Sequence, residues 1–160
     1  MSSRCCRCWI TTGAVLLGLA TIAGAYAAHG IEDILVDVYG SPEGFQPPER
    51  IEHFKQLDPP AVKALRDFRT GVRYHVWHAL GMMATGLIGL IPGTRRWPLE
   101  LAAWSFGLGI IGFSGSLYGL SLTGNASFGL VAPVGGTLMI LAWFFLAAGI
   151  CPCGTQASGD

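Results

Sequence analysis

Four long stretches of this sequence carry almost no charge. Of the 20 acidic and basic residues, 14 lie between Glu32 and Arg73, so most of the remaining chain is nearly uncharged. A helix needs about 20 mainly apolar residues to cross a hydrocarbon layer about 30 Å thick. Four windows meet this requirement, and we predict membrane spans at about residues 9–28, 70–91, 99–122 and 128–150.

None of these windows has a charged residue in its central half. An unpaired charge there costs about 3 kcal/mol on insertion scales, and each Leu or Ile returns about 0.5 kcal/mol, so insertion is favourable. Four helices that are apolar on all sides would leave a soluble protein with too little polar surface to cover them. The sequence therefore predicts an all-α fold, an integral membrane four-helix bundle that forms a single domain over residues 1–160.

The net charge narrows the expected partners. Ten acids balance ten bases, and no element carries a basic stripe, which argues against binding to nucleic acid. We expect contact with the lipid bilayer and with other membrane-protein subunits.

The first span has an alternative interpretation. Arg4 and Arg7 precede its apolar run, and Ala25-Tyr26-Ala27 fits the A-x-A site of a secretory signal peptide. The run is longer than the roughly 7 to 15 residues usual in a signal peptide, which favours a retained span.

Basic residues in the short loops predict the orientation. Arg95 and Arg96 lie between the second and third spans, whereas the loop between the third and fourth has no base. Short basic loops stay in the cytoplasm. We therefore expect both termini in the cytoplasm, in the bacterial cytoplasmic (inner) membrane, although the bases of the long first loop favour the opposite orientation.

The first loop, residues 29–69, has structure of its own. Gly, Pro and Ser are frequent from residue 37 to residue 50, which indicates an irregular connector. Asp58 and Pro59 then form a helix start, and Val62, Leu65 and Phe68 share one stripe, so we predict a short amphipathic helix at about 59–69. It lies either on the membrane interface or over the bundle, and a bend at Thr70 and Gly71 leads into the second span.

Small residues recur along the spans at steps of three and four. Because lipid gives no hydrophobic drive for pairing, such residues mark the faces where helices approach one another. The stripes are Ser105, Gly109, Gly112, Ser116, Gly119 and Thr123 in the third span, Gly71, His75, His78, Met82, Thr85 and Gly89 in the second, and Ala20, Gly24 and Ala28 in the first. We predict helix packing at Gly24, Gly109, Gly112, Ser116 and Gly119 in particular.

A candidate polar cluster lies near one end of the second span: His29, Arg73, Tyr74, His75 and His78. Three imidazoles could hold a metal or relay a proton. The alternative is neutral histidines bonded to backbone or to hydroxyl groups, and we favour it because no acid or cysteine accompanies them. A haem would need histidines at equal depth, which His29 and His78 do not provide. We expect no metal, no cofactor and no catalytic residue.

Pro133 and the cysteines allow further interpretations. Pro133 either starts the fourth helix or kinks it, and a start is the simpler reading. The five cysteines lie only near the chain ends, at positions 5, 6, 8, 151 and 153. Palmitoylation, a shared thiolate metal site and plain reduced thiols all remain open, and we favour the last.

Four sequence blocks resemble a known family in order and spacing. They are GAYAAHG (24–30), TGVRYHVWHAL (70–80), FSGSLYGLSLTG (113–124) and APVGG (132–136). They resemble the domain of unknown function 423, which includes the transmembrane protein 256-like small membrane proteins. The resemblance implies four membrane helices and no established activity. It places family positions on His29, Arg73, Tyr74 and His78, and an insertion at about Asp33 to Phe54.

Two classes of function follow. The first is a multi-pass membrane protein that acts as a non-enzymatic accessory or assembly component of a membrane complex. The second is a small transporter or membrane enzyme that handles a proton, a metal or an anion through His29, Arg73, Tyr74 and His78. We favour the first because the sequence offers abundant packing faces and no catalytic constellation.

Overall fold

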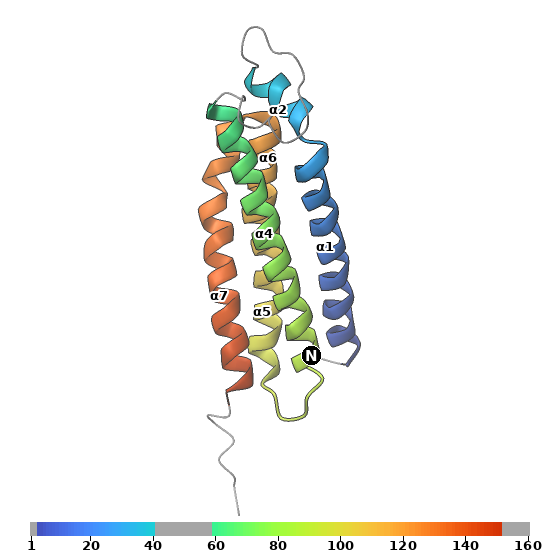
Figure 1. Ribbon diagram of the computed structural model, residues 1–160. Helices are drawn as coiled ribbons and strands as arrows, with labels where there is room; N and C mark the ends of the chain where they lie inside the picture. The colour runs from blue at the N-terminus through green and yellow to red at the C-terminus, as the bar shows by residue number, and fades with distance from the viewer. Residues whose placement is uncertain (1–2, 41–58, 152–160) are drawn as a thin grey trace, which may run out of the picture.

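The computed structural model describes residues 3–40 and 59–151, and this part of the chain is all helical. The long helices run side by side along one axis, and α2 lies across one end of them (Figure 1). The elements are α1 (Ser3–His29), α2 (Glu32–Tyr39), α4 (Pro59–Ile88), α5 (Arg96–Gly109), the π-helix η1 (Ile110–Gly115), α6 (Ser116–Thr123), the 3-10 helix η2 (Ala126–Leu130) and α7 (Ala132–Ile150).

Three helical stretches are long and apolar enough to cross a membrane. They are Ser3–His29, Arg96–Thr123, in which α5, η1 and α6 form one rod, and Ala126–Ile150. The fourth expected span belongs to α4, which is long but carries Lys63, Arg66, Asp67, Arg69 and Arg73 in its first half. The described residues therefore show an all-helical protein with three candidate spans.

The helices pack in the order of the chain. α4 lies between α1 and the rod of α5, η1 and α6, and α7 packs mainly on that rod. α4 and α7 touch only sparsely. Two faces consequently remain open, the outer side of α1 and the surface between α4 and α7.

Helix α4 corrects two expectations about the first loop. A separate helix at 59–69 followed by a bend at Thr70 and Gly71 is wrong, because one helix runs from Pro59 to Ile88 without interruption. Gly71 allows a neighbour to approach instead of bending the chain: a Cβ there would lie 2.9 Å from the Tyr118 ring. Leu65 and Phe68 are buried against α1 and α2, so this stripe covers the helices of the protein itself.

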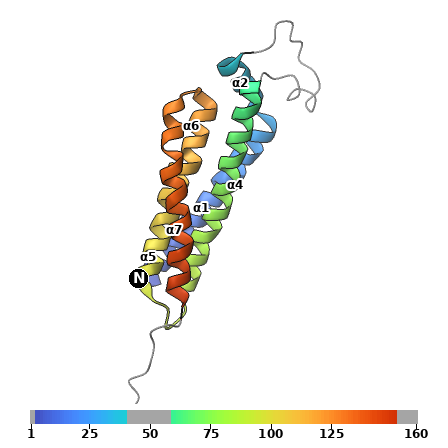
Figure 2. The same cartoon turned by 90° about the vertical axis from the view of Figure 1, so that its left-hand side faces the viewer.

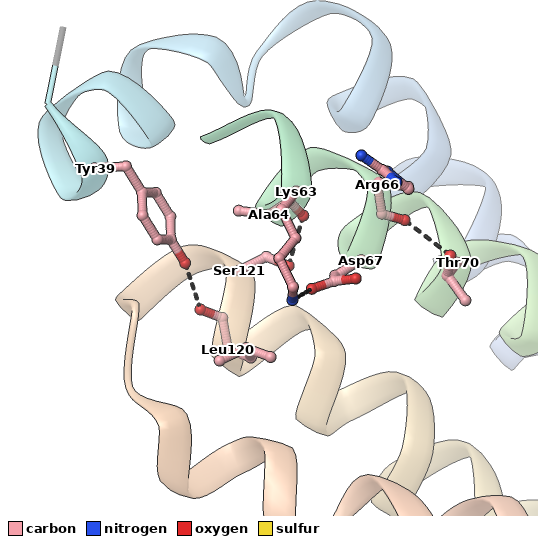
Figure 3. Close-up of polar contacts among 8 residues, drawn as sticks. All are labelled: Tyr39, Lys63, Ala64, Arg66, Asp67, Thr70, Leu120 and Ser121. Carbon is pink, nitrogen blue, oxygen red and sulfur yellow. Dashed lines mark hydrogen bonds and ion pairs between the residues drawn. The ribbon is translucent and has the colours of Figure 1, made fainter. Parts of the chain in front are cut away.

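Helix α2 was not predicted. Leu35 of this helix and Ile31, which directly precedes it, are fully buried, and the Tyr39 hydroxyl donates a 3.0 Å hydrogen bond to the Leu120 carbonyl of α6 (Figure 3). Ile31 and Leu35 are four apart with acids between them, which is the helical pattern that the sequence reading passed over. The irregular connector expected over residues 37–50 was wrong at residues 37–39, which belong to α2, and its part from residue 41 onward and the Asp58 cap lie outside the described residues.

Helix α1 packs on α4 through a seam with a seven-residue repeat. Its buried residues are Cys6, Gly13, Ala20 and Ala27. A Cβ on Gly13 would lie 2.6 Å from the Met83 side chain and 2.9 Å from the Ala79 carbonyl. The predicted stripe was wrong at Ala28, which is exposed, whereas a Cβ on Gly24 would lie 3.4 Å from the Val72 side chain.

Helix α7 approaches the central rod through glycines. A Cβ on Gly109 would lie 2.7 Å from the Met139 side chain, and one on Gly112 would lie 3.0 Å from the Gly135 Cα. Gly112 belongs to the π-helix η1, through which α5 continues into α6 without a break. At the same rod, Ser116 is buried and Gly119 faces the Phe128 ring. Pro133 stands in the first turn of α7, so the helix-start interpretation is confirmed.

Candidate functional site

The structure separates the members of the predicted polar cluster. Gly24 of α1 lies opposite Val72 of α4, and the two helices are antiparallel, so His29 lies toward the start of α4. At 1.5 Å per residue, His29 is about 12 Å above His75 along the axis and about 16 Å above His78. The three imidazoles do not form one cluster, and the described residues contain no group of three metal-ligating side chains.

Arg73, Tyr74 and His78 do share one feature, a groove between α4 and α7 that we call the lateral groove. Its volume is about 610 Å³. Figure 2 looks toward the side on which α4 and α7 lie next to each other. The groove is lined by Arg73, Tyr74, Trp77 and His78 of α4, Phe113 of η1, and Gly136, Met139, Ile140 and Trp143 of α7.

His78 is held in position at the inner wall of this groove. Its Nδ1 lies 2.7 Å from the Tyr74 carbonyl oxygen, which can only accept, so Nδ1 carries the hydrogen and donates it. The imidazole stacks on the Tyr74 ring at 5.8 Å and meets Phe106 and Trp143 at 5.8 and 6.1 Å. A hydrogen bond from the imidazole to the backbone is one of the arrangements that the sequence favours for these histidines.

His75 faces the central rod and takes no part in the groove. Its Nδ1 lies 3.3 Å from the Tyr118 hydroxyl of α6, and the two groups share a hydrogen bond. Its Nε2 is buried and has no partner among the residues that the structure describes. His75 therefore joins two helices and is inaccessible to a ligand in the lateral groove.

A second hollow continues from the lateral groove toward the start of α4. It has a volume of about 480 Å³ and is lined by Val62, Leu65, Arg66, Arg69, Thr70 and Arg73. Arg73 borders both hollows, so they meet at its side chain. We call Arg66, Arg69 and Arg73, which lie on one stripe of α4, the arginine row.

The terminal cysteines lie at one end of the molecule. The beginning of α1 and the end of α7 lie at the same end of the helix bundle (Figure 1). Cys6 is buried, Cys8 is exposed and Cys151 is half-buried, while Cys153 lies outside the described residues. Palmitoylation, metal binding and free thiols all stay open for this end.

Sequence reading did not find the lateral groove. Arg73, Tyr74 and His78 were named, but their companions Phe113, Gly136 and Trp143 come from distant segments. In this groove the Arg73 guanidinium borders an apolar wall, an arrangement that can accommodate one anionic and one apolar group.

Comparison with known proteins identifies relatives but no activity. The chain is 33% identical over 140 residues to a UPF0382 membrane protein of Staphylococcus epidermidis, covering 88% of this chain and 92% of that one. It is 30% identical over 141 residues to the UPF0382 membrane protein YwdK of Bacillus subtilis, covering 88% and 93%. A UPF0382 membrane protein of Haemophilus influenzae is 30% identical over 126 residues, or 79% of each chain.

No solved structure matches this chain. The family model described as "Protein of unknown function (DUF423)" matches residues 23–136, which include the arginine row and most of the lateral groove. With this match and the bacterial membrane proteins above, the chain belongs to the DUF423 family of membrane proteins of unknown function.

Proposed function

We propose that this protein is a non-enzymatic membrane component with four spans, which acts as an accessory or assembly partner in a larger membrane complex. The part of α4 from residue 70 to residue 88 supplies the fourth span in this proposal. It lies between two helices that are themselves candidate spans, and its residues from Ala79 to Ile88 carry no charge.

The supporting observation is an unused face of α1. Small residues follow one another at steps of three and four along its outer side, and all are exposed: Thr11, Ala14, Gly18, Thr21, Ala25 and Ala28. A Cβ on Gly18 would meet nothing within 4 Å. In a bilayer such stripes let another helix approach closely, as the inner seam of α1 does with α4. A partner helix would pack on this face.

Co-purification from mild detergent tests this proposal. The full chain should retain a stoichiometric membrane partner, and Gly18→Leu should release it because a bulky side chain holds the helices apart. Thr12→Leu, which adds a bulky side chain at an exposed position of the same helix away from this stripe, is the matched control and should retain the partner. Recovery of the chain alone, or equal recovery of the partner with both variants, would contradict the proposal.

We also propose that the protein resides in the bacterial inner membrane with both termini in the cytoplasm. Arg95 and Arg96 lie at the start of α5, directly after the short turn from α4 and at the same end as the beginning of α1 (Figure 1). Reporter fusions at the carboxyl terminus should be active with a cytoplasmic reporter and silent with a periplasmic one. A periplasmic reporter that is active at this terminus, with a silent cytoplasmic one, would contradict this orientation.

A second candidate is a small transporter or membrane enzyme that handles a proton, a metal or an anion. It is favoured by one observation, that Arg73, Tyr74 and His78 border the same groove. Proteoliposomes loaded with a pH dye would distinguish the two: proton flux that is lost in His78→Gln without loss of folding supports the transporter, and no flux supports the accessory role.

A further inference from the structure

The arginine row concentrates positive charge on one side of α4. Steps of three and four place Arg66, Arg69 and Arg73 on one stripe, within about 10 Å of helix. The nearest acid in sequence, Asp67, is already bound to Lys63 at 2.6 Å, and the Arg66 guanidinium points away from it (Figure 3). Like charges repel each other, so an anion beside Arg66 and Arg73 is stabilised.

The lateral groove begins where the row ends. Arg73 lines both hollows, so an anion at Arg73 lies at the mouth of a groove whose walls are mostly hydrocarbon and aromatic carbon. Trp77, Ile140 and Trp143 are 59%, 60% and 45% exposed, so the groove is accessible from the side that faces lipid. Its 610 Å³ falls within the roughly 300–1,000 Å³ typical of small-molecule sites.

These two features require an amphiphile. A free phosphate would bind the arginines and leave the apolar wall uncovered, and a neutral lipid would cover the wall without supplying an anion to Arg66 and Arg73. Guanidinium forms two parallel hydrogen bonds to phosphate oxygens, which favours a phosphate ester. Trp77, one turn beyond Arg73, is the residue type that marks the boundary between headgroups and hydrocarbon.

We propose that the arginine row and the lateral groove form one binding site for an anionic phospholipid. The phosphate lies against Arg73 and Arg66, and one acyl chain occupies the groove between α4 and α7. The lipid then fills the space across which these two helices touch only sparsely. This site is separate from the outer face of α1 and does not depend on the accessory role.

Native mass spectrometry of the full-length protein in mild detergent tests the proposal. Phosphatidylglycerol and phosphatidylcholine with identical acyl chains are added in equal amounts. The dissociation constant of the first bound phosphatidylglycerol should be at least fivefold lower than that of phosphatidylcholine, since each arginine near a membrane surface contributes about 1 kcal/mol toward an anionic lipid. Equal binding of the two lipids would overturn the proposal.

Two pairs of variants locate the site. Arg73→Gln should weaken phosphatidylglycerol binding about five- to tenfold, whereas Arg96→Gln, which removes the same charge at the opposite end of α4, should leave it unchanged. Gly136→Leu places a side chain in the groove and should weaken binding, whereas Gly18→Leu on the outside of α1 should not. Equal losses in Arg73→Gln and Arg96→Gln would show general charge attraction and refute the site.

A competition experiment distinguishes binding of the lipid from binding of a free anion. Glycerol phosphate, added in large excess, should not displace phosphatidylglycerol, because it lacks the chain that occupies the groove. Full displacement would show an anion site and overturn the lipid assignment. Arg73→Lys, which keeps the charge, and circular dichroism of every variant confirm that any loss reflects binding and not misfolding.

Discussion

Gly135 offers the sharpest test of the packing described above. It lies where α7 crosses the π-helix, and a Cβ added to it would be 2.5 Å from the Gly112 carbonyl carbon and 2.9 Å from the Phe113 Cα. It would be closer still to the Phe113 amide nitrogen. All three are backbone atoms of a continuous helix, so no side-chain rotation relieves the clash. Gly135→Ala must therefore push α7 away from the rod.

The expected cost follows from these distances. Ordinary van der Waals contact begins at 3.4 Å, so α7 must retreat by about 1 Å along this seam. A gap of this size forfeits about a quarter to a half of each contact's dispersion energy, and the neighbouring contact between Gly109 and Met139 is affected as well. Overpacking costs about 1–3 kcal/mol. We expect Gly135→Ala to lower the free energy of unfolding by about 2–3 kcal/mol.

Thermal unfolding in detergent, followed by circular dichroism, measures this effect. The midpoint should fall by roughly 4–12 °C, if the scaling for chains of 150 to 250 residues holds. Gly18→Ala is the matched control because it makes the same chemical change in a helix where a Cβ meets nothing within 4 Å. It should leave the midpoint unchanged or raise it slightly. Equal midpoints for the two variants would refute the close approach at Gly135.

Two hydrogen bonds at the α2 end provide further predictions (Figure 3). The buried Ser121 hydroxyl donates to the Ala64 carbonyl at 2.8 Å, so Ser121→Ala should cost about 0.5–1.5 kcal/mol in a chemical unfolding titration, while exposed Ser127→Ala costs nothing measurable. Tyr39→Phe removes the bond to Leu120 and should cost a similar amount. Burial raises the pKa of Tyr39 above 10.0, with a smaller opposing effect of Lys63, so the neutral phenol stabilises the fold below pH 10 and this contribution is lost as the pH rises through the higher value. The unfolding midpoint of the wild type should then fall more steeply above pH 10 than that of Tyr39→Phe, and parallel pH curves would contradict this assignment.

The long helices were predictable because lack of charge is a property of each segment by itself. Insertion energy depends on residues within one window, and no partner is needed to read it. The start of α7 at Pro133 was predictable for a similar reason, since proline lacks the amide hydrogen that a helix interior uses. Helix α2 was missed because an eight-residue helix depends on neighbours for stability, here the buried contacts of Ile31 and Leu35.

Relative positions of helices were harder to predict. The stripe Ala20, Gly24 and Ala28 advances by four residues, and each step of four rotates about 40° around the helix. The observed repeat of seven rotates only about 20° in the other sense, so it stays on the partner, and Ala27 takes the place of Ala28. The prediction that His29 joins His75 and His78 was wrong because α4 begins 11 residues before the expected start of its span. His75 and His78 therefore lie far along α4 from the end of α1.

The sequential packing of the helices bears on how the chain assembles. α1 finds its main partner in α4, the next long helix to be synthesised, and the rod and α7 are each added against a neighbour already in place. Contacts between chain neighbours require little loop closure, so assembly of this kind is fast. Each helix can therefore dock on a helix that was synthesised before it.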